Sequence, residues 1–108
     1  MKVLSSDLIR GHIDTIILSV LMDGEKYGVE IRKSIDQKTN GLYRTNEQTL
    51  YSAFRRLEEN GMIKGFWGDE LRGSTRKYYQ ITPLGVEYYF SSKKEWENAK
   101  RLIDILIG

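Results

Sequence analysis

The sequence contains no cysteine, one histidine and one proline among its 108 residues. Without cysteine the chain forms no disulfide and offers no thiolate ligand, and His12 alone supplies too few imidazole nitrogens for a zinc centre. A nucleophile that needs a histidine base would depend on the same residue, and no glycine loop of the phosphate-binding form occurs. We therefore expect no catalytic residues, no metal site and no cofactor.

Long apolar runs are missing as well. No run approaches the ~20 residues that a membrane span needs, and the N-terminus lacks the pattern of a cleavable secretory signal. The absence of cysteine is compatible with a reducing interior. The length suits one fold with a modest core. We expect a cytoplasmic protein without a membrane partner.

The net charge is only +2, but the charges are unevenly distributed. Residues 26–80 contain eleven Lys or Arg against seven Asp or Glu, residues 1–25 contain two against four, and residues 81–108 are balanced. The middle of the chain is therefore its basic part. On charge alone, nucleic-acid binding and an ordinary solvated surface are both open interpretations.

Apolar residues at helical spacing predict two helices in the first part of the chain. The first, residues 5–22, has two apolar faces, so we expect it to contact two different partners. The second, residues 27–38, follows a break at residues 23–25. A short turn over residues 39–44 then leads to a third helix.

The third predicted helix begins near Thr45, with Thr45 and Asn46 as alternative N-caps, and ends at Asn60-Gly61. One side carries an apolar stripe. The opposite side gathers short hydrogen-bonding groups and guanidinium groups at the positions Thr45, Gln48, Ser52, Arg55 and Arg56.

After this helix the pattern changes to two short runs rich in β-branched and aromatic residues, 63–67 and 76–82, which flank a turn with two glycines. The order of elements predicts a mainly α fold with a two-stranded β-wing, that is, a winged helix-turn-helix over residues 1–82. A last helix, residues 83–107, begins with Thr82 as N-cap and Pro83 at its first position. We assign residues 83–108 to a C-terminal dimerisation helix.

In a winged helix-turn-helix the second helix of the pair enters the major groove of double-stranded DNA. We therefore expect base or phosphate contacts from the third helix through Gln48, Thr49, Ser52, Arg55 and Arg56. For Arg56, pairing with Glu58 or Glu59 is an equally weighted alternative. In the wing we expect contacts to the DNA backbone from Arg72, Thr75, Arg76 and Lys77. A plain polar turn that does not contact DNA would show the same composition.

Along the last helix a seam at alternating steps of three and four residues predicts pairing with a second copy of the chain. Its members are Tyr89, Ser92, Trp96, Ala99, Ile103 and Leu106. On this seam Trp96 lies between the small side chains of Ser92 and Ala99. If the seam packs against a second copy, we expect the large ring to border a gap at the dimer centre with room for a small molecule. A tryptophan that simply fills the core of a dimer is the alternative.

The segments "YGVEI" (27–31), "TLYSAFRRLEENGMI" (49–63) and "RKYYQITPLG" (76–85) together resemble the PadR family of bacterial transcriptional regulators. The resemblance implies a homodimeric repressor whose first and last helices build the dimer, with Tyr51 and Lys77 as phosphate contacts. Gln48 stands where the family commonly has glycine, and Ser52 stands where it commonly has proline. Both residues lie on the face that is expected to meet DNA. The resemblance therefore implies the family's fold but not a shared operator sequence.

The run "WGDE" (67–70) and the tryptophan in the last helix are similar to the multidrug-binding repressors of that family. The similarity implies that a planar aromatic compound binds at the centre of the dimer. The predicted ligand-binding residues are Leu8, Thr15, Leu18, Ser92, Trp96, Ala99 and Lys100. Two other functions stay open, a winged-helix module that binds protein and a DNA-binding repressor without a small-molecule ligand.

Overall fold

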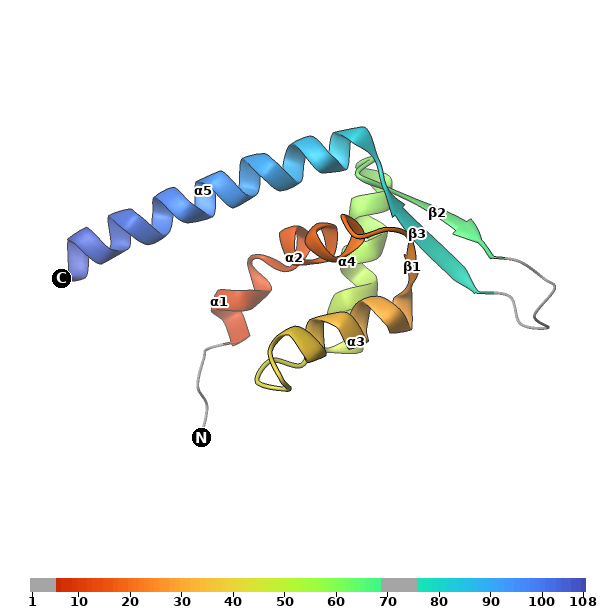
Figure 1. Cartoon of the computed structure of the whole chain (residues 1–108), viewed down its shortest axis with the longest axis horizontal. Helices are drawn as coiled ribbons and strands as arrows, with labels where there is room; N and C mark the ends of the chain where they lie inside the picture. The colour runs from red at the N-terminus through yellow and green to blue at the C-terminus, as the bar shows by residue number, and fades with distance from the viewer. Residues whose placement is uncertain (1–5, 69–75) are drawn as a thin grey trace.

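Helices and a small sheet surround one apolar core, and a long C-terminal helix extends beyond it (Figure 1). The computed structural model describes residues 6–68 and 76–108. The elements are α1 (Ser6–Arg10), α2 (Ile13–Leu21), β1 (Lys26–Tyr27), α3 (Gly28–Lys38), α4 (Glu47–Glu59), β2 (Ile63–Trp67), β3 (Lys77–Ile81) and α5 (Pro83–Ile107). A mainly α winged helix-turn-helix with a long C-terminal helix was predicted from the sequence, and this fold is confirmed.

The single helix predicted over residues 5–22 is wrong, because α1 and α2 are separate helices. Gly11 and His12 form a turn between them, and the His12 amide donates to the Ile9 carbonyl over 2.8 Å. Glycine is a poor helix former, and His12 begins α2 without a side-chain hydrogen bond to a free amide. The break places the His12 side chain at the corner between the two helices.

A tight turn joins α3 to α4. Asn40 and Gly41 both have positive φ, 51° and 80°, and the Gly41 amide donates to the Asp36 carbonyl over 2.9 Å. Asn46 caps α4, since its Oδ1 accepts hydrogen bonds from the Gln48 and Thr49 amides. Thr45, the other cap considered, is buried, so its predicted place on the outward face is wrong.

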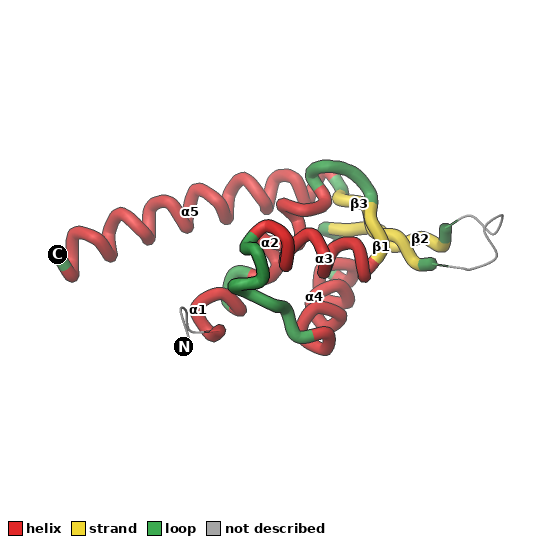
Figure 2. The backbone as a smooth tube through the Cα atoms, turned by 60° about the horizontal axis from the view of Figure 1, so that its bottom comes forward, coloured by secondary structure: helices red, strands yellow, loops and turns green. Residues whose placement is uncertain are grey.

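The wing has a third strand that the sequence analysis did not predict (Figure 2). The strand order is β1-β3-β2, and both pairings are antiparallel, with Tyr27 opposite Tyr78 and Ile63 opposite Ile81. Two residues are too few to show the alternation that identifies a strand. The extra strand attaches the start of α3 to the wing.

The core lies between α2, α3, α4 and the inner side of the sheet. From α4 it takes the predicted stripe, namely Leu50, Ala53, Phe54 and Leu57, each with at most 1% of its surface exposed. Burial of this stripe is the main force that holds the helix in place. The opposite side of α4 is left facing solvent.

The end of α4 is joined to the start of α5. Thr82 caps α5 as predicted: its hydroxyl accepts from the Gly85 amide over 3.0 Å and donates to the Gly61 carbonyl over 2.7 Å. The Thr82 amide also donates to the Met62 carbonyl. Gly85 is buried beside that segment, and a Cβ there would lie 2.1 Å from the Met62 carbonyl oxygen. The two helix ends are therefore in direct contact.

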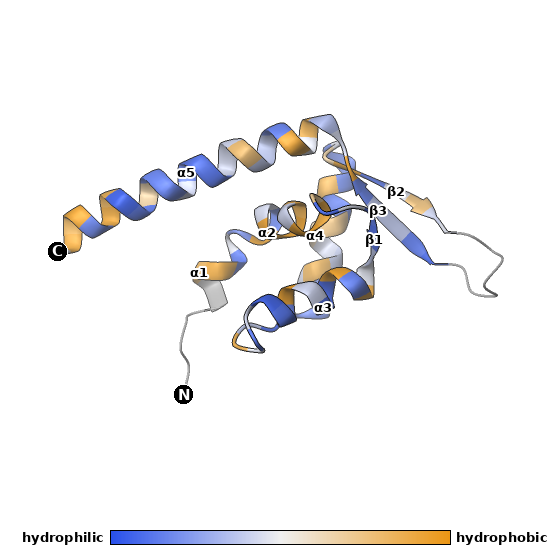
Figure 3. Ribbon diagram, viewed as in Figure 1, coloured by the Kyte–Doolittle hydropathy of each residue, from blue (hydrophilic) through white to orange (hydrophobic). Residues whose placement is uncertain are grey.

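Beyond its first turns α5 has little of its surface covered. Its last residues are apolar (Figure 3), and the side chains of Leu102, Ile103, Ile105, Leu106 and Ile107 are all exposed. Such a patch is larger than single exposed apolar residues, which are normal on a surface.

Within residues 6–68 and 76–108, no helix combines the length and apolar character needed to cross a membrane.

Candidate nucleic-acid interface and aromatic pocket

The outward face of α4 carries three exposed polar side chains from the predicted set, Gln48, Ser52 and Arg55. Thr49 is half-buried beside them. Because Asn46 already accepts from the first free amides of the helix, the side chains rather than the backbone are the groups this end offers to a partner. Amide, hydroxyl and guanidinium groups of this kind match the donors and acceptors of base edges.

Arg56 lies at the flank of this face and has a partner within the protein. Its Nε donates to Asp14 Oδ2 over 3.1 Å, and its Nη2 donates to Asp14 Oδ1. Hydrogen bonding to Asp14 raises the pKa of Arg56 above its ordinary value. The predicted alternative had placed Glu58 or Glu59 opposite Arg56, and Asp14 takes that position instead.

Three predicted phosphate contacts meet in a small hollow at the base of the wing. Tyr51 from α4 and Arg76 and Lys77 from the wing line a space of about 170 Å³ next to Gly28. A Cβ at Gly28 would lie only 3.0 Å from the Tyr51 hydroxyl oxygen, so glycine allows the ring to sit over the start of α3. Arg76 lies over the ring of Tyr27, with its guanidinium carbon 4.6 Å from the ring centre.

Lys77 is less free than Arg76. Its ammonium group donates to Glu58 over 3.2 Å and lies 5.5 Å from the ring centre of Tyr79. Arg72 and Thr75, the other two predicted wing contacts, lie outside the described residues.

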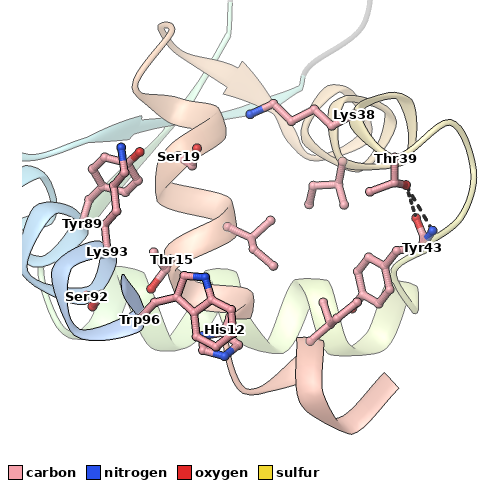
Figure 4. Close-up of a pocket in the computed structure, with 13 residues that line it drawn as sticks. His12, Thr15, Ser19, Lys38, Thr39, Tyr43, Tyr89, Ser92, Lys93 and Trp96 are labelled. Atoms are coloured by element: carbon pink, nitrogen blue, oxygen red, sulfur yellow. Dashed lines mark hydrogen bonds between the residues drawn. The ribbon is translucent and has the colours of Figure 1, made fainter. Parts of the chain in front are cut away.

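Trp96 is 44% exposed, and its indole meets His12 in an edge-to-face contact with ring centres 4.8 Å apart. Beside this pair is a hollow of about 440 Å³, shown in Figure 4, whose walls come from the α1–α2 corner, the end of α3 and α5. The lining residues are Ile9, His12, Thr15, Ile16, Ser19, Ile35, Lys38, Thr39, Tyr43, Tyr89, Ser92, Lys93 and Trp96. A volume of this size suits a small aromatic molecule.

Two lysines reach this hollow from different helices, Lys38 from α3 and Lys93 from α5 (Figure 4). No Asp or Glu occurs among the described residues that line it. On another wall Thr39 holds the backbone of Tyr43 through hydrogen bonds, and burial raises the pKa of the Tyr43 phenol. The lining is therefore mostly apolar, with positive charge at two points.

A second hollow also borders Trp96 and has a different character. It is lined by Gly11, His12, Thr15, Tyr88, Ser92, Glu95, Trp96, Asn98, Ala99 and Leu102. Among the described residues that line it, Glu95 is the one acidic side chain, and none is Lys or Arg. Thr15, Ser92 and Trp96 line both hollows, and Ala99 lines this one, so four predicted ligand residues are brought together.

The other three predicted ligand residues are elsewhere. Leu18 has 0% of its surface exposed and belongs to the core, because α2 turns that side toward the protein interior. Leu8 is 68% exposed, and neither it nor Lys100 lines either hollow beside Trp96. Lys38 and Tyr43 were not predicted from the sequence, because only the tertiary fold brings the end of α3 and the turn after it near α5.

Among the described residues, no three His, Asp or Glu side chains gather closely enough to hold a metal ion.

Comparison with known proteins gives consistent matches. The chain is 54% identical to a transcriptional regulator from Clostridium thermocellum of known structure, with a TM-score of 0.88 and coverage of 94% of this chain and 96% of that one. A PadR family transcription regulator from Clostridium difficile is 31% identical, with a TM-score of 0.77 and coverage of 90% and 99%. An uncharacterized protein from Lysinibacillus sphaericus is 43% identical over 94% of both chains.

A family model described as the transcriptional regulator PadR-like family matches residues 17–90. That segment runs from α2 to the first part of α5 and contains the complete helix-turn-helix. The chain therefore belongs to the PadR-like family of transcriptional regulators and is not an enzyme.

Proposed function

We propose that the chain is a homodimeric repressor that binds a double-stranded DNA operator and leaves it when a planar aromatic molecule binds beside Trp96. The observation that carries the proposal is the exposed face of α4, where Gln48, Ser52 and Arg55 are unobstructed. The second helix of such a pair presents this face to base edges in the major groove.

The hollow at the base of the wing supports a contact with the DNA backbone. Tyr51 offers a hydroxyl group and Arg76 a guanidinium group from two different elements. Contacts of this kind position a protein on the duplex and carry no sequence information of their own. We assign Lys77 a weaker role, because Glu58 already neutralises its charge.

The exposed apolar end of α5 supports the dimer. Leu106 is 79% exposed and Ile103 is 48% exposed, so a partner helix would remove a large apolar area from water. Two-fold pairing would place the two copies of α4 about one helical turn of DNA apart, roughly 34–36 Å.

The composition of the first hollow supports a guest that is both aromatic and negatively charged. His12 and Trp96 offer ring surfaces for stacking, while Lys38 and Lys93 offer positive charge. The two copies of α4 in the dimer could have more than one spacing. A guest that binds better to a dimer with a different spacing would favour that spacing and so lower the affinity for the operator.

Selection of bound duplexes from a random pool, followed by titration of the selected duplex at several salt concentrations, tests the proposal. A DNA-binding repressor enriches one sequence, and its affinity falls as salt rises because phosphate contacts release counterions. A module that binds protein enriches no DNA sequence, and it shows no salt-dependent binding to a defined duplex. A repressor without a small-molecule ligand also passes this test, but aromatic carboxylates do not quench the fluorescence of its Trp96.

A further inference from the structure

The Asp14–Arg56 ion pair joins two helices with different tasks. Asp14 lies on α2, and Arg56 lies on α4, forty-two positions later in the sequence. Both nitrogens of the guanidinium fork that face Asp14 make hydrogen bonds, one to each carboxylate oxygen. A two-point contact of this kind restrains orientation as well as distance.

The surroundings of the pair connect it to both predicted sites. On α2, Asp14 is adjacent in sequence to Thr15, which lines both hollows beside Trp96. On α4, Arg56 is one helical turn after Ser52, which belongs to the outward face that is proposed to meet DNA.

The apolar core restrains α4 in a different way. Burial of Leu50, Phe54 and Leu57 keeps the helix against the domain, but apolar contact has no preferred direction. The hydrogen bonds between Arg56 and Asp14 add a directional restraint at the edge of that contact. Because the carboxylate neutralises the guanidinium, Arg56 also adds little net attraction for phosphate.

We infer that Arg56 is a positioning residue whose pair with Asp14 sets the orientation of α4 on α2, and through it the separation of half-sites that the dimer reads. The inference rests on the proposed function, since it needs a dimer bound to a two-part operator. It assigns Arg56 a different role from Arg55, which faces solvent on the reading side.

The test uses the full-length protein and a set of duplexes that differ from the selected operator only in the number of base pairs between half-sites. The variants are Asp14→Asn, Arg56→Gln, the two combined, and the exchanged pair Asp14→Arg with Arg56→Asp. Asp23→Asn is the matched control, because it removes one exposed acid just after the same helix.

We expect each single variant to bind the operator roughly two- to fivefold more weakly, the factor that matches the coupling of exposed ion pairs. Each should also lose its preference for one half-site separation, with an unchanged dependence of affinity on salt. The combined variant should be no worse than either single one, and the exchanged pair should recover the preference. Asp23→Asn should keep it.

A different pattern would overturn the inference. If Arg56 contacts phosphate, Asp14→Asn binds more tightly than wild type, Arg56→Gln lowers the salt slope by about 1, and the exchanged pair is the weakest. Retained separation preference in the single variants would also overturn it. Failure of the wild type to bind any duplex with salt dependence would instead reject the proposed function, and the inference with it.

Discussion

The imidazole of His12 meets the indole of Trp96 edge-on, at an angle of 63° between the ring planes. This contact fixes one side of the tryptophan and leaves its remaining faces toward the two hollows. The ring is therefore both a structural contact of α5 and an exposed stacking surface.

If the hollow takes an aromatic acid, naphthalene-2-carboxylate should quench Trp96 fluorescence, and the neutral carboxamide of the same ring should bind less well. The measurement uses a Trp67→Phe background, which leaves Trp96 as the single tryptophan. Lys38→Met and Lys93→Met should each weaken carboxylate binding roughly two- to fivefold and reduce the preference over the amide.

Lys33→Met and Lys94→Met are matched controls for this titration, because these lysines lie on the same two helices and do not line the hollow. Equal binding of carboxylate and amide would contradict the charge assignment. Absence of quenching by a panel from benzoate to anthracene carboxylate would make Trp96 a dimer-core residue only.

Replacement of Arg55 by alanine should cost roughly 1–3 kcal/mol on the selected operator and relax the preference at one base position. Arg76→Ala should instead weaken binding to all duplexes about equally and lower the salt slope by about 1, as a phosphate contact does. Electrophoretic or fluorescence titrations at several salt concentrations separate the two. Similar losses with similar salt slopes would show that the two side chains do not have these separate roles.

The joint substitution Ile103→Asp with Leu106→Asp should produce monomers, because it places two charges in the apolar end of α5. Sedimentation at micromolar concentration is the measurement. Lys94→Asp changes the net charge by the same amount at an exposed position outside that patch and should leave the dimer intact. A monomeric wild type would mean that the apolar end of α5 is not a dimer interface.

Gly85→Ala should destabilise the fold by roughly 1–3 kcal/mol, because the added methyl would overlap the Met62 carbonyl and force backbone movement. Thermal or urea unfolding measures the loss. Glu87→Ala, at an exposed position of the same helix, should change stability little. An unchanged Gly85→Ala midpoint would show that the α4–α5 junction is looser than described.

Alkaline pH should weaken the fold through Tyr79, since burial raises its pKa above the ordinary value of 10.0. A group whose pKa is raised on folding contributes its full stability below the unfolded-state pKa and loses it as pH rises through the folded-state pKa. Urea unfolding between about pH 9 and 11 measures the decline. Tyr79→Phe should make the decline in the free energy of unfolding smaller, whereas Tyr78→Phe on the same strand should leave the decline unchanged.

Short-range chemistry explains which elements were predictable. Thr82 and Pro83 mark the start of α5, and Asn60 with Gly61 marks the end of α4, because capping and positive φ depend on a few adjacent residues. The choice of Asn46 over Thr45 depended on burial of the threonine, which follows from tertiary packing.

Contacts between distant segments were beyond the reach of periodicity. The reading face on α4 follows from helical spacing alone. The partner of Arg56 does not, since Asp14 is separated from it by forty-two positions. The same reason applies to Lys38, which lines the Trp96 hollow only because the tertiary fold places the end of α3 across that hollow from α5.

The hydrogen bonds of Thr82 join the end of α4 to the start of α5 at Gly61 and Met62, so a rotation of the two helices as one body would have its pivot at this junction. The reading end of α4 is the end remote from that pivot, about 20 Å away for a helix of 13 residues. A rotation of about 5° at the pivot would displace the far end of α5 by about 3 Å and the reading end by roughly 2 Å. The apolar end of α5, where a second copy would pack, lies farther from the junction than the Gln48 end of α4, so a given rotation moves the proposed dimer contact farther than it moves the helix end that faces the groove.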